Sequence, residues 1–237
     1  MKKAIVIGSS SGIGKELAIL LSKNGYKVGV TGRRKSKLEE IRNTNTDAFI
    51  VQPFDCTLNN SIDELTELVK ELGGLDLLIF SSGIGDINTE LDYEIENRTN
   101  QLNVIAFTKI TSWAYNYFEE QKQGHLVAIS SIAGLRGGQF APAYNASKAF
   151  QINYLEGIRQ KACKTKNPIT ITDIRPGFID TAMAKGVGLF WVASKEKAAK
   201  QILKSIATNK DITYVSKRWR IIAILLKILP NFIYKRL

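Results

Sequence analysis

The stretch AIVIGSSSGIG, residues 4–14, decides the fold. Its first four residues are all apolar, and a strand without polar positions is typical of a parallel sheet that is buried on both faces. Gly8, Gly12 and Gly14 follow at once, in the spacing G-x-x-x-G-x-G. Glycines directly after a strand let the backbone turn tightly, and the residues beyond them favour a helix. The chain therefore begins with a strand, a glycine-rich turn and a helix.

The same alternation of short apolar runs and helical segments continues along the chain, which predicts a parallel sheet covered by helices. We expect strands at Ala4–Ile7, Val28–Thr31, Phe49–Gln52, Leu75–Phe80, His125–Ser130, Ile169–Ile174 and Ile212–Val215. We expect helices at Ile13–Asn24, Ser36–Asn43, Ile62–Leu72, Asp92–Gln121, Ala143–Cys163 and Lys195–Thr208. No linker rich in Pro, Gly or Ser divides the sequence. The prediction is an α/β, single-domain Rossmann fold over residues 1–216. Its centre is a doubly wound parallel seven-stranded sheet with helices on both faces. A basic, apolar C-terminal segment follows over residues 217–237.

Spacing supports the helix expected at Ala143–Cys163. Its apolar residues recur at intervals of three and four, which predicts one packed face; they are Phe150, Tyr154, Leu155 and Ile158. Pro142 is suited to open this helix, because a proline in the first turn lacks only a donor that has no partner there.

The composition excludes several classes of protein. The chain has 237 residues, 44% of them hydrophobic, enough for one large domain that folds without metals or disulfides. It has two cysteines and a single histidine, His125. Most multi-residue zinc sites, and any histidine-dependent triad not built on His125, are thereby excluded, and no metal is expected. The N-terminal apolar run is too short for a signal peptide, and no apolar run reaches the roughly 18 residues that span a bilayer. A cytoplasmic protein is expected.

The glycine-rich turn also indicates a ligand. A helix that starts at such a turn offers amides and the positive end of its dipole to a pyrophosphate. At the end of the second strand, folds that bind NAD usually carry an acidic residue for the ribose hydroxyls. This chain has Arg33 and Arg34 there and no carboxylate. Because guanidinium groups form charge-assisted bonds to phosphate, we expect NADP(H) in preference to NAD(H); the alternative is a solvated arginine pair.

The segment Tyr144-Asn-Ala-Ser-Lys148, after Ser130 and Ser131, indicates proton chemistry. Residues four apart on a helix share one face, so Tyr144 and Lys148 are expected to project together. An ammonium beside a phenol favours the phenolate and lowers the tyrosine pKa from its usual value of about 10. A hydroxyl tuned in this way can deliver or accept a proton near neutral pH.

With these motifs the sequence resembles the short-chain dehydrogenase/reductase family over nearly its whole length. The matching pieces come in the order that the family has them: Gly8–Gly14, Asp55, Gly83, Asn103, Ser131, Tyr144, Lys148 and Pro176-Gly177. The resemblance implies an NAD(P)-dependent enzyme that interconverts a carbonyl and an alcohol of a small molecule by hydride transfer.

The resemblance also implies roles for individual residues. Tyr144 would be the general acid/base, Ser131 would hydrogen-bond the substrate oxygen, and Lys148 would bind the nicotinamide ribose and lower the Tyr144 pKa. Asn103 would hold a water that links Lys148 to solvent as a proton relay. Asp55 would meet the adenine, and Ile179 and Thr181 would meet the nicotinamide carboxamide. The residues that would bind the cofactor are Gly8, Ser10, Ser11, Gly12, Ile13, Gly14, Arg33, Arg34, Asp55, Cys56, Ser82, Gly83, Tyr144, Lys148, Pro176, Gly177, Ile179 and Thr181.

Two positions depart from the family pattern. The family commonly has Thr before the first glycine, where this chain has Ile7. After the fourth strand the family often shows Asn-Asn-Ala-Gly, whereas this chain has Phe80-Ser-Ser-Gly83. The change removes amide side chains beside the adenosine half of the cofactor and leaves the four catalytic positions intact, so an active enzyme is expected.

Two further segments suggest how the protein meets other molecules. Leu189, Phe190 and Trp191, with glycines at 186 and 188, suit either a lid over a lipophilic substrate or a hydrophobic anchor on the core. The segment KRWRIIAILLKILPNFIYKRL, residues 217–237, suits either an anionic membrane surface or packing on the body or on a partner subunit. The helices Asp92–Gln121 and Ala143–Cys163 resemble the family's usual subunit interface, which implies a homodimer or homotetramer.

The sequence argues against two functions other than catalysis. A non-catalytic dinucleotide sensor would not need Asn103, Ser131, Tyr144 and Lys148 together. The net charge of +11 alone suggests nucleic acid, but the densest basic cluster is interleaved with aliphatic residues and no reading motif accompanies it. No nucleic-acid partner is expected.

Overall fold

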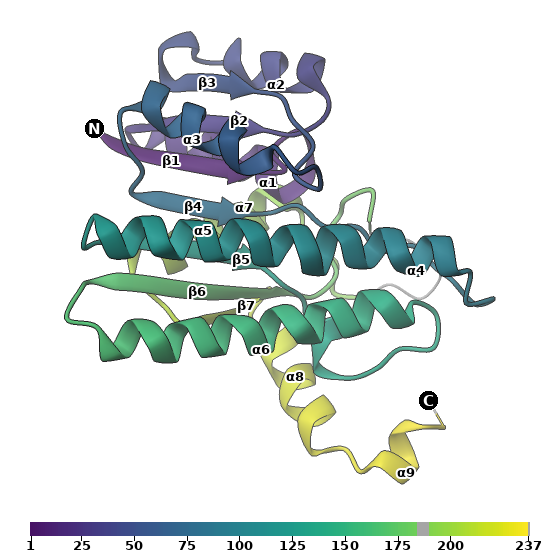
Figure 1. Cartoon of the computed structure of the whole chain (residues 1–237). Helices are drawn as coiled ribbons and strands as arrows, with labels where there is room; N and C mark the ends of the chain where they lie inside the picture. The colour runs from purple at the N-terminus through teal and green to yellow at the C-terminus, as the bar shows by residue number, and fades with distance from the viewer. Residues whose placement is uncertain (184–189, 237) are drawn as a thin grey trace.

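A seven-stranded parallel sheet forms the centre of the molecule. The computed structural model describes residues 1–183 and 190–236 (Figure 1). The strands are β1 (Lys2–Ile7), β2 (Tyr26–Thr31), β3 (Phe49–Gln52), β4 (Leu77–Phe80), β5 (Gly124–Ile129), β6 (Ile169–Pro176) and β7 (Ile212–Val215). Their order across the sheet is β3-β2-β1-β4-β5-β6-β7. The predicted doubly wound parallel sheet is confirmed.

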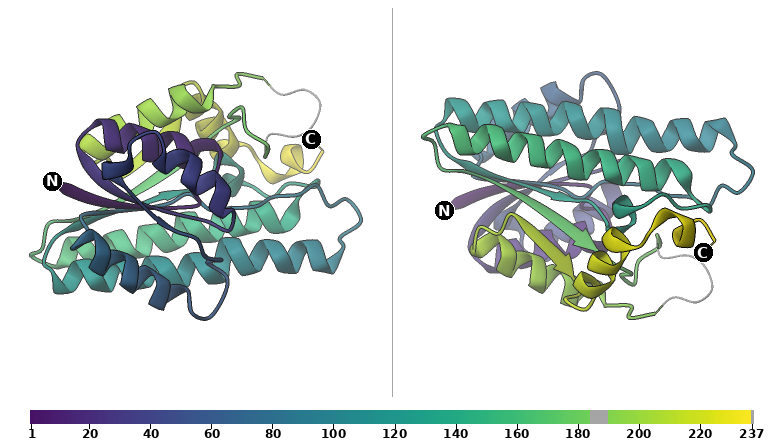
Figure 2. Two further views of the ribbon diagram at one scale, coloured as in Figure 1. Left: turned by 90° about the horizontal axis from the view of Figure 1, so that it is seen from above. Right: turned by 90° about the horizontal axis from the view of Figure 1, so that it is seen from below.

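Helices cover both faces of the sheet (Figure 2). One face is packed by α3 (Ser61–Leu72), α5 (Phe107–Glu120) and α6 (Pro142–Lys164). The other is packed by α1 (Gly12–Lys23), α2 (Lys35–Arg42) and α7 (Lys195–Ala207). The remaining helical segments are α4 (Tyr93–Asn100), α8 (Trp219–Ile228), α9 (Asn231–Tyr234), the short 3-10 turns Thr46–Ala48 and Ile132–Leu135, and a π-helical turn at Gln101–Ala106.

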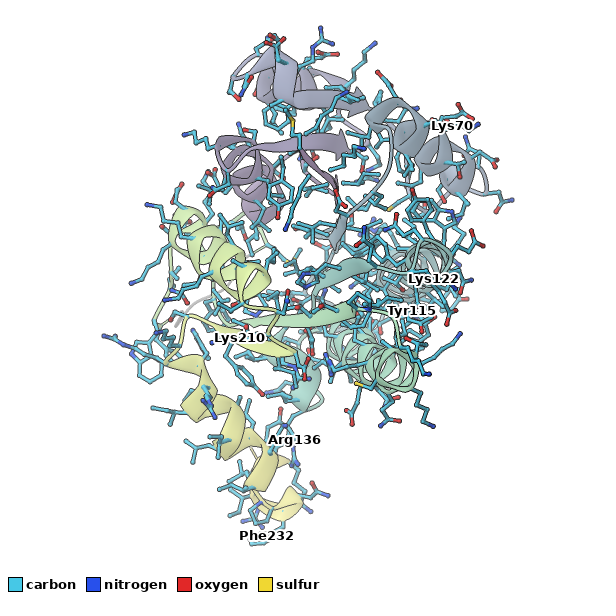
Figure 3. All side chains as sticks on the ribbon, turned by 90° about the vertical axis from the view of Figure 1, so that its left-hand side faces the viewer. Lys70, Tyr115, Lys122, Arg136, Lys210 and Phe232 are labelled. Carbon is cyan, nitrogen blue, oxygen red and sulfur yellow. The ribbon has the colours of Figure 1, made fainter. Side chains whose placement is uncertain are left out.

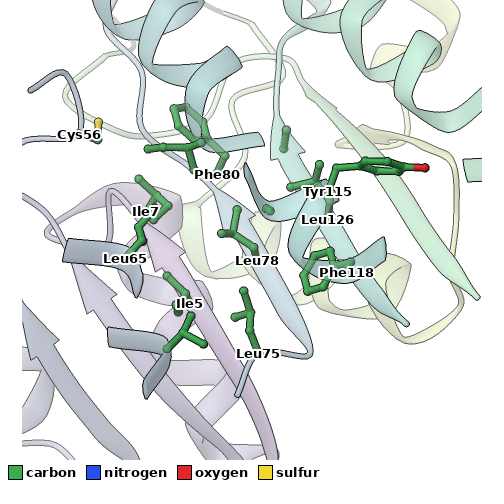
Figure 4. Close-up of a cluster of buried hydrophobic side chains, with 14 of the residues drawn as sticks. Ile5, Ile7, Cys56, Leu65, Leu75, Leu78, Phe80, Tyr115, Phe118 and Leu126 are labelled. Atoms are coloured by element: carbon green, nitrogen blue, oxygen red, sulfur yellow. The ribbon is translucent and has the colours of Figure 1, made fainter. Parts of the chain in front are cut away.

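The larger hydrophobic cluster lies between the sheet and the helices α3, α5 and α6 (Figure 4). Phe80 of β4 and Phe107 of α5 meet edge to face, with ring centroids 5.3 Å apart. The stripe predicted on α6 packs here through Leu155, Tyr154 and Ile158, whereas Phe150 is 38% exposed and stacks on Tyr154. Pro142 stands in the first turn of α6, as predicted.

The helix expected at Asp92–Gln121 contains an irregularity that the sequence pattern did not show. It consists of α4, the π-helical turn at Gln101–Ala106 and α5, end to end. A π-helical turn inside an α-helix inserts one residue, rotates the side chains that follow it and is frequent at functional sites. Here it contains Asn103, one of the predicted site residues.

The strand order places a ligand site by topology. The chain crosses from β3, at one edge, to β4, which pairs with β1 on its other side. In open α/β sheets the crevice at such a reversal, outside the carboxyl ends of the strands, is where ligands bind. Gly8 follows β1 there, and Ser81 follows β4.

The chain ends in a segment that stands away from this body. Helix α8 follows β7 directly, and α9 lies beyond it, at the end of the chain in Figure 1. Among the described residues, no helix has the length and apolar character needed to cross a membrane. The division of the chain into residues 1–216 and 217–237 stays a prediction.

Candidate active site

The glycine-rich turn is packed against the loop after β4. Gly8 has a φ of +83°, which favours glycine, and a Cβ at this position would lie 2.5 Å from Ser82 Oγ. Gly14 has no room for a side chain either, because a Cβ there would meet the carbonyl oxygen of Gly8. The Ser9 amide donates to Thr31 O of β2 over 2.9 Å. The turn is therefore held between β2 and the β4 loop at the reversal of strand order.

The start of α1 has no side-chain cap. Ser11 stands at the N-cap position but its side chain accepts no hydrogen bond from the first helical turn, and that turn holds no acidic residue. Amides in a first turn lack partners within the helix. The first turn of α1 thus keeps donors for an anion beside Gly12.

The two arginines after β2 are both near the glycine-rich turn. Arg34 donates from Nη2 to Ser10 Oγ over 2.8 Å and to Ser11 Oγ over 2.9 Å. Arg33 lies 3.9 Å from the Asp55 carboxylate, and its side chain is 73% exposed. The structure thus brings Arg34 to Ser10 and Ser11 of the turn, and Arg33 to Asp55.

Lys148 is the buried charge of the site. Its side chain lies on α6, one turn after Tyr144, and the residue is 3% exposed. Nζ donates to Ile129 O over 3.0 Å and to Gln151 Oε1 over 2.9 Å. Burial lowers the pKa of Lys148 to about 8, against a smaller opposing effect of the Asp173 charge. Lys148 therefore loses its proton at a pH not far above neutral.

Tyr144 lies beside Ser131, as predicted, but its pKa moves in the opposite direction from the one expected. Burial raises the pKa of Tyr144, and a hydrogen bond with the Ser131 side chain lowers it by less. The expected lowering by Lys148 is not found, because the ammonium is 5.8 Å from the ring centroid and donates to two other oxygens. The expectation of a lowered Tyr144 pKa was thus wrong for the chain alone.

Ser131 lies two residues after β5 and caps the short 3-10 turn that follows. Its Oγ accepts from Ala133 N over 3.1 Å and lies 3.5 Å from Pro176 O of β6. These contacts hold the hydroxyl between the carboxyl ends of β5 and β6. The predicted Ser131, Tyr144 and Lys148 therefore meet at one edge of the sheet.

Asn103 holds the loop after β4 instead of pointing toward Lys148. Its Oδ1 accepts from Ile84 N over 3.0 Å, and its Nδ2 donates to Ile84 O over 2.7 Å and to Ser147 Oγ over 3.0 Å. The side chain is completely buried. A two-way bond between one amide and one peptide unit fixes the loop, and a Cβ built at Gly83 would lie 3.4 Å from Lys148 Nζ.

Gln151 is a site residue that the sequence analysis missed. It lies on α6, three residues after Lys148, and is completely buried. Its Oε1 accepts from Lys148, and its Nε2 donates to the main-chain oxygen of Asn103 over 2.8 Å. The signal in the sequence is a polar residue at helical spacing from Lys148, on a face that is otherwise packed.

A second missed feature is a buried ion pair beneath Ser130. Asp173 of β6 receives bonds from the Ser130 hydroxyl and, over 2.6 Å, from Arg175 Nε. Both charged side chains are almost fully buried. Burial raises the pKa of Asp173 in spite of Arg175. This carboxylate is the one whose charge partly offsets the burial of Lys148.

The other predicted cofactor residues surround the turn or lie in the core. Thr181 is the nearest neighbour of a Cβ built at Gly12, at 3.5 Å. The Cys56 thiol is buried next to Ser82, and burial raises its pKa to about 11. Ile13 and Ile179 pack against or within the hydrophobic cluster beside α1 and α7. Pro176 and Gly177 end β6, and the ring of Trp219 lies directly over Gly177.

The segment expected as lid or anchor is described from Phe190 onward; Leu189 and the glycines at 186 and 188 lie outside the described residues. Phe190 packs on Phe178 and on Trp219, with ring centroids 5.9 and 5.0 Å away. Trp191 lies 6.0 Å from Trp219. Phe190 is nevertheless 48% exposed and Trp191 41% exposed. These four residues, Phe178, Phe190, Trp191 and Trp219, form what we call the aromatic cluster.

The single histidine is remote from this site. His125 stands near the start of β5, at the opposite end from Ser131, and its Nε2 lies 2.8 Å from Thr172 Oγ1. Burial lowers the pKa of His125 to about 4. It takes no part in the arrangement around Tyr144.

Comparison with known proteins assigns the family. A family model described as short chain dehydrogenase matches residues 2–191. The chain is 35% identical over 186 residues to an uncharacterized oxidoreductase of Staphylococcus aureus (strain USA300), which covers 77% of this chain and 80% of that protein. The protein belongs to the short-chain dehydrogenase family. An uncharacterized oxidoreductase of Myxococcus xanthus is 32% identical over 188 residues, 77% of this chain and 74% of that one.

Solved structures agree with this assignment at the level of the fold. A short-chain dehydrogenase from Sphingobium yanoikuyae in complex with NADPH superposes with a TM-score of 0.82 at 20% identity, over 98% of this chain and 97% of that one. A short-chain dehydrogenase from Streptomyces avermitilis gives a TM-score of 0.82 at 22% identity, over 95% and 91%.

Membership establishes the general activity. The protein is an oxidoreductase of the short-chain dehydrogenase type, a family whose general reaction interconverts a carbonyl and an alcohol of a small molecule with NAD(P). Enzymes of this family usually form oligomers.

The burial of Lys148 predicts how stability changes with pH. The pKa is about 8 in the folded chain against an ordinary 10.5, so between these values the unfolded state binds more protons and stability rises with pH. Relative to Lys148→Met, the free energy of unfolding of the wild type should gain up to about 1.4 kcal/mol per pH unit across this window. Urea unfolding of both proteins between pH 7 and 10 measures the difference.

Lys70→Met is the control for this experiment, because the Lys70 side chain is 66% exposed. The free energies of unfolding of the wild type and of Lys70→Met should differ by the same amount at every pH in this range. A constant difference for Lys148→Met as well would show that the Lys148 ammonium titrates normally.

Proposed function

We propose that the protein is an NADP(H)-dependent oxidoreductase that interconverts a carbonyl and an alcohol on a lipophilic small molecule, with Tyr144 as general acid/base. The observation that carries the proposal is the convergence of Tyr144, Ser131 and Lys148 at the carboxyl ends of β5 and β6. This group stands beside the glycine-rich turn, at the reversal of strand order where a dinucleotide binds in such sheets.

The residues present fit a dinucleotide. The turn at Gly8 and Gly14 has no room for side chains, and the first turn of α1 has uncapped amides and no acidic residue. Backbone approach and a positive dipole are the two features that a pyrophosphate needs. Gly83 and Lys148 would line the nicotinamide half, and Asp55 the adenine half.

The charge around Ser10 and Ser11 supports NADP(H) over NAD(H). Arg34 already donates to both hydroxyls, so its guanidinium lies over the turn with further N–H groups to offer. A carboxylate that would bind ribose hydroxyls is missing at the end of β2, and a 2′-phosphate would add the anion that Arg33 and Arg34 favour.

In this mechanism the cofactor supplies or accepts the hydride when it is bound. Ser131 Oγ holds the substrate oxygen and leaves Tyr144 to deliver the proton to it. The raised pKa of Tyr144 keeps the phenol protonated, which suits the direction of reduction. With a pKa of about 8, Lys148 can give up a proton near neutral pH and so restore the phenol after proton transfer.

The aromatic cluster supports a lipophilic substrate. Phe190 and Trp191 are half-exposed on the side where Ile179 and Thr181 follow β6. Apolar side chains beside a few polar groups are typical of small-molecule sites.

The outer faces of α5 and α6 are proposed as the subunit contact of a homodimer or homotetramer. Phe150 is 38% exposed, and Ile105, just before α5, is 56% exposed. Exposed apolar side chains on neighbouring helices are typical of such contacts.

Calorimetric titration of NADPH and NADH tests the cofactor assignment. Arg34→Ala should weaken NADPH binding about 10- to 100-fold, because a hydrogen bond to a charged group contributes about 1.5–3 kcal/mol, and should leave NADH binding nearly unchanged. Lys37→Ala, an exposed cation on α2 next to Arg34, is the matched control. Equal losses for both cofactors would contradict the 2′-phosphate site.

Turnover tests the role of Tyr144. With lipophilic ketones and aldehydes as substrates, Tyr144→Phe should lower kcat by about 10²- to 10⁴-fold, because the general acid is lost, while NADPH affinity stays within a few-fold. Tyr154→Phe, on the same helix but within the core, should keep most of the activity. A Tyr144→Phe variant that turns over like the wild type would refute the mechanism.

The pH profile of reduction tests Gln151 as a positioning residue for Lys148. Gln151→Met removes an acceptor from a buried ammonium, so the alkaline limb that reports Lys148 should move to lower pH by about 1–2 units. Gln151→Glu places a carboxylate at the same distance and should move that limb to higher pH. A purely structural role would shift neither limb, and Gln160→Met, exposed on the same helix, provides the baseline.

A further inference from the structure

Helices α8 and α9 form an arm that leaves the body of the molecule in one defined direction (Figure 3). At its root, Trp219 and Ala223 are buried against the body. Near its end, Arg136 donates to Asn231 Oδ1 over 2.9 Å and lies over the Tyr234 ring, and Tyr234 donates to Gly137 O. Contacts at both ends fix which face of the arm points to solvent.

The solvent face of α8 is a stripe of aliphatic side chains. Its members recur at intervals of three and four residues, and each is more than half exposed: Ile221 (60%), Ile224 (52%), Leu225 (51%) and Ile228 (69%). Trp219 and Ala223 lie on the opposite side of the same helix. Helix α9 continues the apolar surface with Phe232, which is 64% exposed. We call these five residues the apolar stripe.

The charged side chains of the described part of the arm are all basic. The chain has no acidic residue after Asp211. All basic side chains of the described arm are exposed: Lys217, Arg218, Arg220, Lys227, Lys235 and Arg236. On α8, Arg220 and Lys227 precede or follow stripe residues directly and so flank the stripe. An apolar face bordered by cations is the pattern of a helix that lies in the interface of an anionic bilayer.

The aromatic cluster lies at the root of the arm. Trp219, at the start of α8, packs on Phe190 and Trp191, and these two rings remain half-exposed. Tryptophan is enriched at the boundary between lipid headgroups and acyl chains. The half-exposed rings of Phe190 and Trp191 therefore lie at the root of the arm.

We propose that this arm binds the surface of an anionic lipid bilayer. The apolar stripe enters the boundary between headgroups and acyl chains, and the basic residues contact lipid phosphates. The ten residues of α8 lie parallel to the membrane plane. The binding does not depend on the proposed activity, although it would place the half-exposed rings where lipophilic compounds partition.

A bilayer suits this face better than a second copy of the chain. In a two-fold contact the same surface lies on both subunits, so the six cations of one arm would face the six of the other. The arm has no acidic residue to pair with them, and like charges in contact oppose association. A lipid surface supplies both the apolar layer and the counter-charge.

Sedimentation with vesicles tests the proposal on the whole chain without cofactor. The wild type should bind vesicles of phosphatidylcholine with 30% phosphatidylglycerol at least tenfold better than vesicles of phosphatidylcholine alone, and high salt should release it. Leu225→Glu should abolish binding. Arg220→Gln with Lys227→Gln should weaken it on the order of tenfold or more, from about 1 kcal/mol for each cation near the surface.

Matched controls are available on the rest of the surface. Leu58→Glu changes a side chain away from the arm that is 56% exposed, and Lys70→Gln removes an exposed charge. Both variants should bind vesicles like the wild type. Light scattering after gel filtration should give all variants one oligomeric state. The proposal is overturned if the wild type ignores anionic vesicles, if the controls lose binding equally, or if Leu225→Glu changes only the oligomeric state.

Discussion

The burial of the Lys148 ammonium constrains the whole arrangement of the site. Removing the charge from water disfavours its protonated form, which is why the pKa falls to about 8. Two protein oxygens replace the water, one at the end of β5 and one on Gln151. Because the Gln151 amide is itself bonded to the main chain of Asn103, the ammonium stays in place only when β5, α6 and the π-helical turn are all correctly packed.

The loop after β4 packs closely against these residues of the site. Asn103 binds both polar atoms of the Ile84 peptide. The loop then passes so near α6 that a Cβ at Gly85 would strike the Tyr144 ring. The main-chain oxygen of Asn103 is occupied by Gln151, whereas the resemblance to the family implied a water relay at Asn103. The Gln151 side chain therefore links Lys148 to the main chain of Asn103, and the water relay at Asn103 stays a prediction.

Much of the fold follows from the sequence because the deciding signals are local. Short runs rich in apolar residues identify every strand of the sheet, and Tyr144 and Lys148 share a helix face because they are four residues apart. The π-helical turn was not predicted, since one inserted residue barely alters the hydrophobic pattern. Gln151 was missed because its partner Asn103 is 48 residues away in the chain. The direction of the Tyr144 pKa is set mainly by burial, and a sequence does not give the depth at which a side chain is buried.

Gly177 is the residue at which the arm packs against the edge of the site. Gly177 follows β6 at the edge of the site, and its N–H donates to Val215 O of β7, the strand that leads to α8. A side chain at Gly177 would collide with the Trp219 ring, so the absence of one lets the root of α8 rest on the end of β6. Trp219 in turn carries Phe190 and Phe178. The orientation of the arm relative to Ser131 and Tyr144 is therefore set by packing and not by a flexible linker.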